Sequence, residues 1–561
     1  MEKNQRFTIT SALPYTNGPI HIGHLAGAYL PADIYARYKR LCENDVAFIC
    51  GSDEHGVAIS IKAKQEGTSI KSIIDKYHNL IKETFEGFGI SFDNYSRTSN
   101  PIHHETSKRF FKKLDKDNCF ELKTTKQLYD ESEDQFLADR YVEGECPKCG
   151  FEKAYGDQCE SCGASLSPTD LINPKSKLSG SKPILKETKH WYLPLGNYEQ
   201  FLSDWILKEK KGKWKTNVYG QVKSWIDQGL ESRAISRDLD WGIPIPRDDA
   251  EGKVMYVWFD APIGYISSTK EWAKKEKKNW EDYWKRTDTK LVHFIGKDNI
   301  VFHCIIFPSI LKAHGEFILP ENVPANEFLN LEGRKISTSN NWAIWLHEYL
   351  KDFKDMQDSL RYTLTVNSPE SKDNDFTWKD FQSRNNNELV AILGNYINRV
   401  FVLTEKYFDN IVPQYEKVDS NQIDKIYDYV SLISNALDKF KFRDSVNHMI
   451  DLARTGNKYL ADKEPWKLYK ENNIKEVEQI IYTSLETCAL LSMLSEPFIP
   501  NSAKKIRQIL NLKLVQWTKL SSENKIIQPG HKLKTSNLIF RKIEDDEVQN
   551  QLIKLNSNVK N

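Results

Sequence analysis

The chain has 561 residues, with 79 Lys and Arg against 78 Asp and Glu, so its net charge of +1 gives no global reason to expect a nucleic-acid partner. The length alone excludes a small disulfide-stapled scaffold. Hydrophobic residues make up 39% and charged residues 28%, and the 14 Trp, 25 Tyr and 26 Phe exclude intrinsic disorder. At roughly 150 residues per domain, the length predicts about three to four folded domains.

The N-terminal segment MEKNQRFTIT has neither an apolar signal core nor an Arg-rich amphipathic arm, and no run of about 18 apolar residues occurs elsewhere. We therefore expect a cytoplasmic location and no membrane partner. Four of the nine cysteines lie within residues 146–162, and the other five are scattered. This distribution favours a metal site in a reducing compartment over a disulfide framework.

The N-terminal third alternates strands and helices. Residues 6–12 are predicted to form a buried strand, followed by a turn-rich loop and a helix over residues 20–40. A second strand, residues 46–53, leads through the loop DEHG into another amphipathic helix, and the runs 253–260 and 290–296 are predicted to be further buried strands. This alternation is typical of an α/β protein with a Rossmann-type, doubly wound parallel sheet.

Two regions depart from this alternation. Residues 116–232 contain the cysteine window and are predicted to be an insertion into the sheet domain. After residue 386 the apolar residues recur at helical spacing, which predicts an α-helical bundle. The Lys-rich run 268–286 has mixed charges and Trp at helical spacing, so a solvated helix face is favoured over a nucleic-acid patch.

The cysteine window has the pattern C-x2-C-x9-C-x2-C, formed by Cys146, Cys149, Cys159 and Cys162. A glycine follows each pair, at Gly150 and Gly163, as two tight knuckle turns require. Four thiolates at this spacing predict one closed, tetrahedral zinc site. Because a closed site leaves no coordination position for a substrate, the zinc is expected to be structural. Disulfide bonds are the alternative.

The segment PYTNGPIHIGH, residues 14–24, lies between the first predicted strand and the first predicted helix. His21 and His24 are three residues apart and would share one face of the opening helical turn, where Gly23 lets a ligand approach the backbone. Helix N-termini attract phosphate, and imidazole N–H groups would add donors. The alternative is a structural histidine pair.

A second polar segment, LEGRKISTS at residues 331–339, concentrates Arg334, Lys335 and three hydroxyl groups. A loop of this composition can close over a triphosphate and neutralise charge that develops in a transition state. Taken alone, it is better explained as a surface loop.

Together these segments resemble the HIGH and KMSKS signatures of class I aminoacyl-tRNA synthetases, here HIGH and KISTS. The segments ALPY (12–15), DEHG (53–56), YVWFDAPIGY (256–265) and HFIGKD (293–298) further resemble the methionyl-tRNA synthetase family. The resemblance runs in order from about residue 7 to at least residue 466 and implies a methionine–tRNA ligase activity. Thr338 departs from the signature, because the family usually has a second lysine there. The hypothesis is that Lys335 and Arg334 carry the charge stabilisation; the alternative is that the loop acts mainly by hydroxyl and backbone contacts.

The resemblance also implies site residues. The methionine pocket would be formed by Ala12, Leu13, Tyr15, Asp53, Trp258, Pro262, Tyr265 and His303. Aromatic and aliphatic walls suit a thioether, and Asp53 is the natural partner of the substrate ammonium. The ATP site would comprise His21, Gly23, His24, Gly296, Asp298, Lys335 and Thr338, with His21, His24 and Lys335 in catalytic roles and Mg²⁺ on the phosphates. Without the resemblance, Trp258 and Tyr265 would be assigned to core packing.

In the helical region, Asn395 and Arg399 lie four residues apart on one predicted helix face, and EPW ends at Trp466. The family reads the anticodon of tRNA(Met) with these positions, since an indole can stack on an unpaired base while Asn and Arg bond its edge. On spacing alone, Trp466 would be a bundle-capping aromatic.

The resulting domain order is given by residue ranges: 1–115 and 233–325 form the two halves of the Rossmann catalytic domain, 116–232 the insertion with the zinc knuckle, 326–385 a stem-contact region with the KISTS loop, and 386–561 the helical anticodon domain. The expected partners are ATP, L-methionine and tRNA(Met), and a monomer is expected. Two alternatives stay open at this point: a nucleotidyltransferase acting on a small acid, and a catalytically altered synthetase-like protein that binds zinc and RNA.

Overall fold

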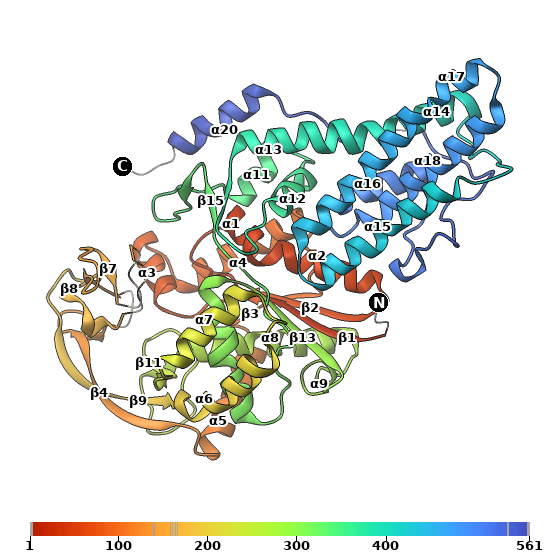
Figure 1. Ribbon diagram of the computed structural model, residues 1–561. Helices are drawn as coiled ribbons and strands as arrows, with labels where there is room; N and C mark the ends of the chain where they lie inside the picture. The colour runs from red at the N-terminus through yellow and green to blue at the C-terminus, as the bar shows by residue number, and fades with distance from the viewer. Residues whose placement is uncertain are drawn as a thin grey trace.

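The structure is a computed structural model that describes residues 4–137, 141–156, 159, 161–162, 164, 166–535 and 538–557. Gly163, expected to close the second knuckle turn, lies outside these residues. In Figure 1 the sheet domain and its insertion occupy the lower half of the molecule, and the helical bundle extends from it at the upper right.

A parallel sheet forms the centre of the N-terminal domain. Its five strands have the order β14 (Ala325–Asn326), β13 (Thr289–Gly296), β1 (Arg6–Ser11), β2 (Asp45–Ser52) and β3 (Asn94–Arg97), and all neighbours are parallel. The chain runs from β1 to β2 on one side, whereas β13 lies on the other. The strand order therefore reverses at β1, and the carboxyl ends of β1 and β13 frame a switch point where ligands bind in such folds.

Helices cover both faces of this sheet. One core joins Phe7 and Phe48 to α2 (Leu30–Leu41) and α4 (Ile70–Gly87). The other joins Ile49 and Leu291 to α5 (Pro101–Lys116), α8 (Val257–Glu276) and α10 (Phe307–His314). Since alternate residues of each strand point to opposite faces, each face buries its own apolar set. The predicted doubly wound α/β fold is confirmed.

The predicted helix over residues 20–40 is found as three consecutive pieces: α1 (Ile22–His24), a π-helical stretch η1 (Leu25–Tyr29) and α2. A π-bulge inserts an extra residue into a helix and often lies at a functional site. Here it directly follows the HIGH segment.

The predicted strand over residues 253–260 is wrong. Only β12 (Lys253–Met255) is a strand, paired with the antiparallel β11 (Ser236–Asp238), and α8 begins at Val257. Periodicity cannot distinguish a short apolar run in a strand from one in a buried helix. Since α8 packs between the sheet and α5, its first turns are apolar on nearly every side.

The Lys-rich run 268–286 forms the end of α8 and the short helix α9 (Glu281–Trp284). Trp272 and Trp284 are buried, whereas Lys274 and Lys275 are exposed. The run is thus a solvated helix face anchored by indoles, as predicted.

The insertion is built on a long antiparallel ribbon of β4 (Glu121–Asp130) and β9 (Ile184–Leu193), which curves around the lower left of Figure 1. A small sheet of β7 (Ala154–Tyr155), β6 (Val142–Glu145) and β8 (Ile172–Ser176) carries the cysteines at its end. α7 (Thr216–Asp227) leads back toward the sheet domain. The small sheet has its own apolar core, which includes Val57 at the start of α3 (Val57–Glu66).

Beyond the sheet, the strands β15 (Leu329–Leu331), β16 (Arg334–Lys335) and β17 (Asn374–Phe376) combine with α11 (Leu346–Asp352), α12 (Gln357–Val366) and α13 (Trp378–Arg384). A bundle follows, formed by α14 (Asn395–Phe408), α15 (Ser420–Asp438), α16 (Phe442–Lys463), α18 (Ile474–Leu494) and α19 (Pro500–Leu510). The predicted α-helical bundle is confirmed, and α20 (Asp545–Ser557) returns to lie beside α13.

Candidate active site

Two stacked imidazoles, those of His21 and His24, lie at the start of α1, after the loop that follows β1. His21 Nδ1 accepts a hydrogen bond from the Gly23 N–H, and His24 Nδ1 accepts one from the His21 N–H, both at 3.1 Å. The ring centroids are 3.7 Å apart. Because Nδ1 accepts in both rings, each neutral imidazole carries its proton on Nε2.

Both rings are neutral at pH 7. Burial, with a further contribution from His24, lowers the pKa of His21 well below its usual value, and burial lowers the pKa of His24 to about 4. The pair therefore offers imidazole N–H donors, rather than cations, at a helix N-terminus.

The KISTS segment folds back onto these histidines. β15 and β16 form a hairpin, and a Cβ atom added to Gly23 would lie 3.1 Å from Ile336 Cδ1. The Ile22 N–H donates to the Ile344 carbonyl oxygen at 3.1 Å, and His21 and Trp345 form a β-bridge. The structure thus brings together the two segments that the sequence singled out separately.

The basic residues of the hairpin lie at its surface. The Lys335 ammonium lies 5.6 Å from the Phe328 ring centroid, and the Arg334 guanidinium lies 5.0 Å from that of Trp342. Both residues are exposed, as is Thr338, whose carbonyl oxygen accepts from the Asn341 N–H in the turn that follows. Charges held in this way can reorient toward an anion without disrupting a core.

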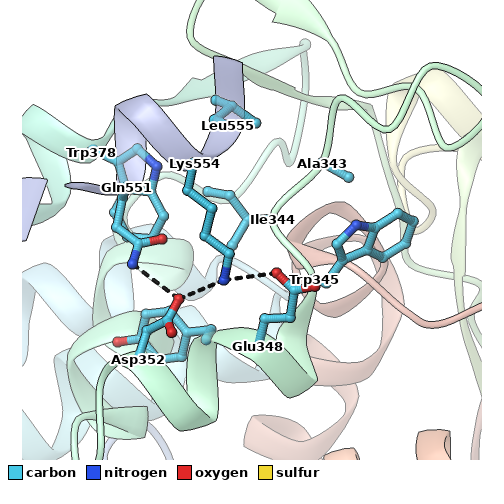
Figure 2. Close-up of a pocket in the computed structure, with 10 residues that line it drawn as sticks. Ala343, Ile344, Trp345, Glu348, Asp352, Trp378, Gln551, Lys554 and Leu555 are labelled. Atoms are coloured by element: carbon cyan, nitrogen blue, oxygen red, sulfur yellow. Dashed lines mark hydrogen bonds and ion pairs between the residues drawn. The ribbon is translucent and has the colours of Figure 1, made fainter. Parts of the chain in front are cut away.

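Trp345, which contacts His21, directly precedes α11, and α11 is held in turn by α20. Figure 2 shows the Lys554 ammonium between Glu348 and Asp352 of α11, at 2.8 Å from each, and the Gln551 amide donating to Asp352 at 3.0 Å. Trp345 lines the same pocket. The C-terminal helix therefore fixes the element next to the HIGH segment.

The other side of the switch point is formed by the end of β13. Gly296 is its last residue, and a Cβ atom there would lie 2.6 Å from Asp298 Oδ1, so the carboxylate folds over the glycine. The Asn326 amide, at the end of β14, donates to the Ala26 carbonyl oxygen of η1 at 3.0 Å. The two predicted nucleotide-binding segments are thus linked through adjacent elements.

Asp53 lies at the carboxyl end of β2, beside Tyr15. The two residues form a β-bridge, and the Thr16 hydroxyl donates to the Asp53 carbonyl oxygen at 3.1 Å. The Asp53 side chain is buried, and burial, together with the charges of Asp260 and Glu54, raises its pKa well above the usual value. An ammonium ligand at this carboxylate would restore its charged form.

The apolar walls predicted for a thioether come from two helices and one loop. Tyr265 of α8 is buried, and its hydroxyl and His303 Nε2 are 2.8 Å apart. Burial lowers the pKa of His303 to about 4. Leu13 packs on α8, because a Cβ atom at Gly264 would lie 3.2 Å from Leu13 Cδ1. Ala12 precedes Leu13, Pro262 lies buried in α8, and Trp258 at its start contacts Phe302 with ring centroids 4.1 Å apart.

Sequence reasoning missed a buried polar cluster behind Asp53. Asp260 Oδ2 lies 2.6 Å from His55 Nδ1 and 3.5 Å from His103 Nε2. His55 and Asp260 lie within segments that carry the family resemblance, yet nothing in either segment alone indicates the other. Their contact forms only when α8 packs against the loop that follows β2.

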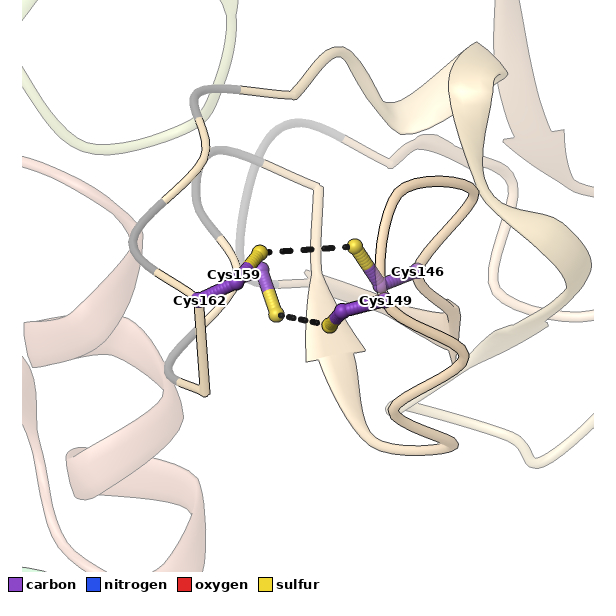
Figure 3. A group of neighbouring side chains, drawn as sticks. All are labelled: Cys146, Cys149, Cys159 and Cys162. Atoms are coloured by element: carbon purple, nitrogen blue, oxygen red, sulfur yellow. Dashed lines mark hydrogen bonds between the residues drawn. The ribbon is translucent and has the colours of Figure 1, made fainter.

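The four cysteines meet at the end of the small insertion sheet, as Figure 3 shows. The Sγ atoms of Cys146 and Cys162 are 3.9 Å apart and those of Cys149 and Cys159 are 3.6 Å apart, and all four lie within 4.8 Å of one another. A tetrahedral zinc ion with bonds of about 2.3 Å separates its sulfur ligands by about 3.8 Å. The thiol geometry therefore fits a zinc site with four cysteine ligands.

The residues predicted to read the anticodon lie at one end of the bundle. The Arg399 guanidinium of α14 lies 5.4 Å from the Trp466 ring centroid, in α17 (Pro465–Lys470). Asn395, one turn before Arg399, is exposed. The structure thus brings Arg399 and Trp466 together and places Asn395 on the same helix.

Among the described residues, no helix is both long and apolar enough to cross a membrane. Residues 7–401 match the family described as tRNA synthetases class I (M), and residues 412–558 match the anticodon binding domain of methionyl tRNA ligase. Relatives named methionine–tRNA ligase include one from Christiangramia forsetii, 61% identical, and one from Bacteroides fragilis, 60% identical; the alignments cover 99% of this chain and 82% and 81% of the relatives.

The fold is also similar to solved structures. The Mycobacterium tuberculosis methionyl-tRNA synthetase in complex with methionyl-adenylate has a TM-score of 0.79 at 23% identity, covering 96% of this chain and 100% of that one. A Rossmann-type sheet with the HIGH and KISTS segments joined at its switch point defines a class I aminoacyl-tRNA synthetase. Within that class, the chain belongs to the methionine–tRNA ligase family.

Proposed function

We propose that this chain joins L-methionine to tRNA(Met) in two steps, using the site at the carboxyl ends of β1, β2 and β13. In the first step the methionine carboxylate attacks the α-phosphate of ATP, giving methionyl-adenylate and pyrophosphate. In the second, a hydroxyl of the terminal tRNA ribose attacks the adenylate and releases AMP. The observation that carries the proposal is the contact between Gly23 and Ile336, which puts both nucleotide segments at one switch point.

The amino acid is proposed to bind with its ammonium at Asp53 and its thioether against Leu13, Trp258 and Tyr265. A carboxylate that is buried and has a raised pKa is a poor isolated charge but a good partner for an ammonium. Aromatic and aliphatic walls favour the polarisable sulfur over a branched or charged side chain. Tyr15 and Ala12 would close the pocket on the side of β1, and Pro262 of α8 and His303 of the π-helical stretch η7 (Phe302–Ile306) on the other side.

The phosphates are proposed to lie over His21 and His24, with the ribose and adenine toward Gly296 and Asp298. The two neutral imidazoles would donate hydrogen bonds as negative charge shifts onto the leaving pyrophosphate. Mg²⁺, when bound with ATP, would supply charge neutralisation on the phosphate oxygens. No protein nucleophile takes part.

Thr338 leaves Lys335 and Arg334 as the basic residues of the KISTS segment. We propose that Lys335, together with the adjacent Arg334, carries the charge stabilisation of the transition state. Lys335→Ala should therefore lower the rate of adenylate formation about tenfold to a hundredfold, as for loss of one charge-assisted hydrogen bond. Arg334→Ala removes the second basic side chain and should lower the rate by a smaller factor. An unchanged rate in Lys335→Ala would refute the assignment.

We propose a zinc ion at the four cysteines, whose role when bound is to cross-link the insertion. We also propose that Trp466, Arg399 and Asn395 bind unpaired anticodon bases by stacking and edge contacts. The many thiol cysteines fit a reducing, cytoplasmic compartment. The monomeric state stays a prediction, which light scattering would test.

The decisive experiment is amino-acid-dependent ATP–pyrophosphate exchange, measured separately with each proteinogenic amino acid. We expect exchange with methionine alone, and subsequent charging of tRNA(Met) but not of a tRNA with another anticodon. Exchange without any amino-acid preference would overturn the assigned pocket. No exchange at all would favour the RNA-binding alternative.

A further inference from the structure

A buried carboxylate lies outside the methionine pocket that the proposed mechanism uses. Asp260 is completely buried in α8, two residues after Trp258 and two before Pro262. Its Oδ2 lies 2.6 Å from His55 Nδ1, in the loop after β2, and 3.5 Å from His103 Nε2, in α5. One carboxylate oxygen thus joins three separate elements.

His55 in turn contacts two residues of the proposed pocket. Its backbone N–H donates to Asp53 Oδ1 at 3.3 Å, and its carbonyl oxygen accepts from the Tyr15 hydroxyl at 2.6 Å. Gly56 follows with a φ of +104°, and a Cβ atom there would clash with the Tyr15 hydroxyl oxygen. The loop 53–56 therefore has little freedom, and Asp260 holds it from the opposite wall of the pocket.

The charge of Asp260 is maintained despite its burial. Burial alone would raise its pKa, yet the His55 and His103 imidazoles keep the pKa below the usual value. His103 is itself fixed by Ser267, whose hydroxyl lies 3.0 Å from His103 Nδ1. A buried carboxylate of this kind is costly unless its partners are well placed, and removing one partner is strongly destabilising for the group that stays behind.

The donor atoms of His55, His103 and Asp260 lie within 4.8 Å of one another, which raises the question of a second metal. Two ligands of a tetrahedral zinc ion, with bonds of about 2.0–2.2 Å, lie about 3.3 Å or more apart. The 2.6 Å between His55 Nδ1 and Asp260 Oδ2 is instead a hydrogen-bond distance. The cluster is therefore a hydrogen-bonded network.

We propose that Asp260 is a positioning residue of the amino-acid pocket, which acts through His55 to hold the Asp53 carboxylate where it meets the substrate ammonium. The inference rests on the proposed methionine site. Asp260 does not touch the substrate. Through His55 it nevertheless contributes to the discrimination between an amino acid and an acid that lacks the amino group. The same network links the loop 53–56 to the helix that carries Trp258 and Tyr265.

The test compares two ligands in Asp260→Asn, which keeps the shape of the side chain and an acceptor for His55 but removes the charge. The ligands are L-methionine, measured by its KM in ATP–pyrophosphate exchange, and its 2-hydroxy analogue, measured by its Ki as an inhibitor of that exchange. Loss of the Asp260 charge also lowers the pKa of Asp53, which on its own favours the charged partner of the ammonium, so a rise in KM reports lost positioning. We expect the methionine KM to rise about tenfold, or 1.4 kcal/mol, while the Ki of the hydroxy acid changes less than about twofold. kcat should fall less than KM rises.

Three further variants keep the test decisive. His55→Asn retains an N–H donor near the position of Nδ1 and should bind methionine more tightly than His55→Leu does. Asp358→Asn removes a buried carboxylate of α12 that bonds the Ser502 N–H at 2.6 Å, and should leave both ligands unchanged. Equal changes for methionine and the hydroxy acid in Asp260→Asn would overturn the proposal, since general distortion of the pocket affects both.

An unchanged methionine KM in Asp260→Asn would also overturn it. These results are distinct from failure of the proposed function, which would be seen as an absence of methionine-dependent exchange in the unaltered chain. If Asp260→Asn does not fold, the comparison of His55→Asn with His55→Leu asks the same question of the loop, and equal ligand ratios in the two variants would refute the role.

Discussion

Substituting Gly23 by Ala tests whether the contact between the two nucleotide segments matters for catalysis. The added Cβ would lie 3.0 Å from His21 Cε1 and 3.1 Å from Ile336 Cδ1. Carbon atoms pack at about 3.5–4.0 Å, so both neighbours must retreat by about 0.4–0.5 Å. His21 has little room, because its ring is stacked on His24 at 3.7 Å. Overpacking of this kind costs about 1–3 kcal/mol.

Since displacing a positioning group by about 1 Å can cost about a hundredfold in rate, we expect Gly23→Ala to lower methionine-dependent ATP–pyrophosphate exchange about tenfold to a hundredfold. The methionine KM should change little, because the pocket lies beyond this contact. Gly27→Ala is the matched control in the same helical stretch, since a Cβ atom there meets nothing within 4 Å. Equal exchange rates in the two variants would refute the argument, as would a loss explained by a large fall in the melting temperature of Gly23→Ala alone.

Three other predictions follow from the site geometry. The protein should contain one zinc ion per chain by atomic emission, and Cys146→Ser should lose it and become sensitive to protease within the insertion; a metal-free protein of full stability would contradict the zinc assignment. Trp466→Ala should lower kcat/KM for tRNA(Met) by a factor that corresponds to about 1–3 kcal/mol, the value of one stacked base, while leaving pyrophosphate exchange intact. The control is Tyr469→Ala, since Tyr469 lies one turn after Trp466 in α17 and stacks on Tyr407 of α14. Because the folded-state pKa of His303 is lowered to about 4 from 6.5, the unfolded state binds more protons between these values, so the free energy of unfolding should fall as pH falls. The loss from His303 amounts to about 2 kcal/mol between pH 7 and pH 5, and His303→Gln should abolish that part in urea titrations.

Features encoded in one continuous segment could be predicted from the sequence. The cysteine spacing predicted a cluster of four thiols, and the four Sγ atoms lie within 4.8 Å of one another. The helical spacing of Ile423, Ile426 and Val430 predicted a buried face, and all three are buried. In these cases the geometry follows from chain connectivity and local periodicity, so no information about distant residues is needed.

Features that depend on contacts between distant segments could not be predicted from the sequence. The start of α8 at Val257 was predicted as a strand, because an apolar run carries no period when both sides are buried. The hydrogen bond between His55 and Asp260 joins residues 205 positions apart. The ion pair between Lys554 of α20 and Glu348 of α11 likewise joins residues that are distant in the chain. Only the packing of α8 on the loop after β2, and of α20 on α11, creates these pairs.

The charges of the residues in the proposed site indicate separate roles for the histidine pair and the KISTS hairpin. Enclosure keeps His21 and His24 uncharged at pH 7, so they can orient phosphate oxygens but add no positive charge. In the proposed site, the positive charge of the chain near the phosphates would come from Lys335 and Arg334 of the KISTS hairpin, where Thr338 occupies the place of a second lysine. Lys335 is exposed and lies against the Phe328 ring, so its ammonium can turn toward an anion at small cost. In the proposed mechanism, a neutral histidine pair that positions the phosphates and a basic hairpin that neutralises their charge are therefore complementary, and the close approach of Ile336 to Gly23 keeps the two together.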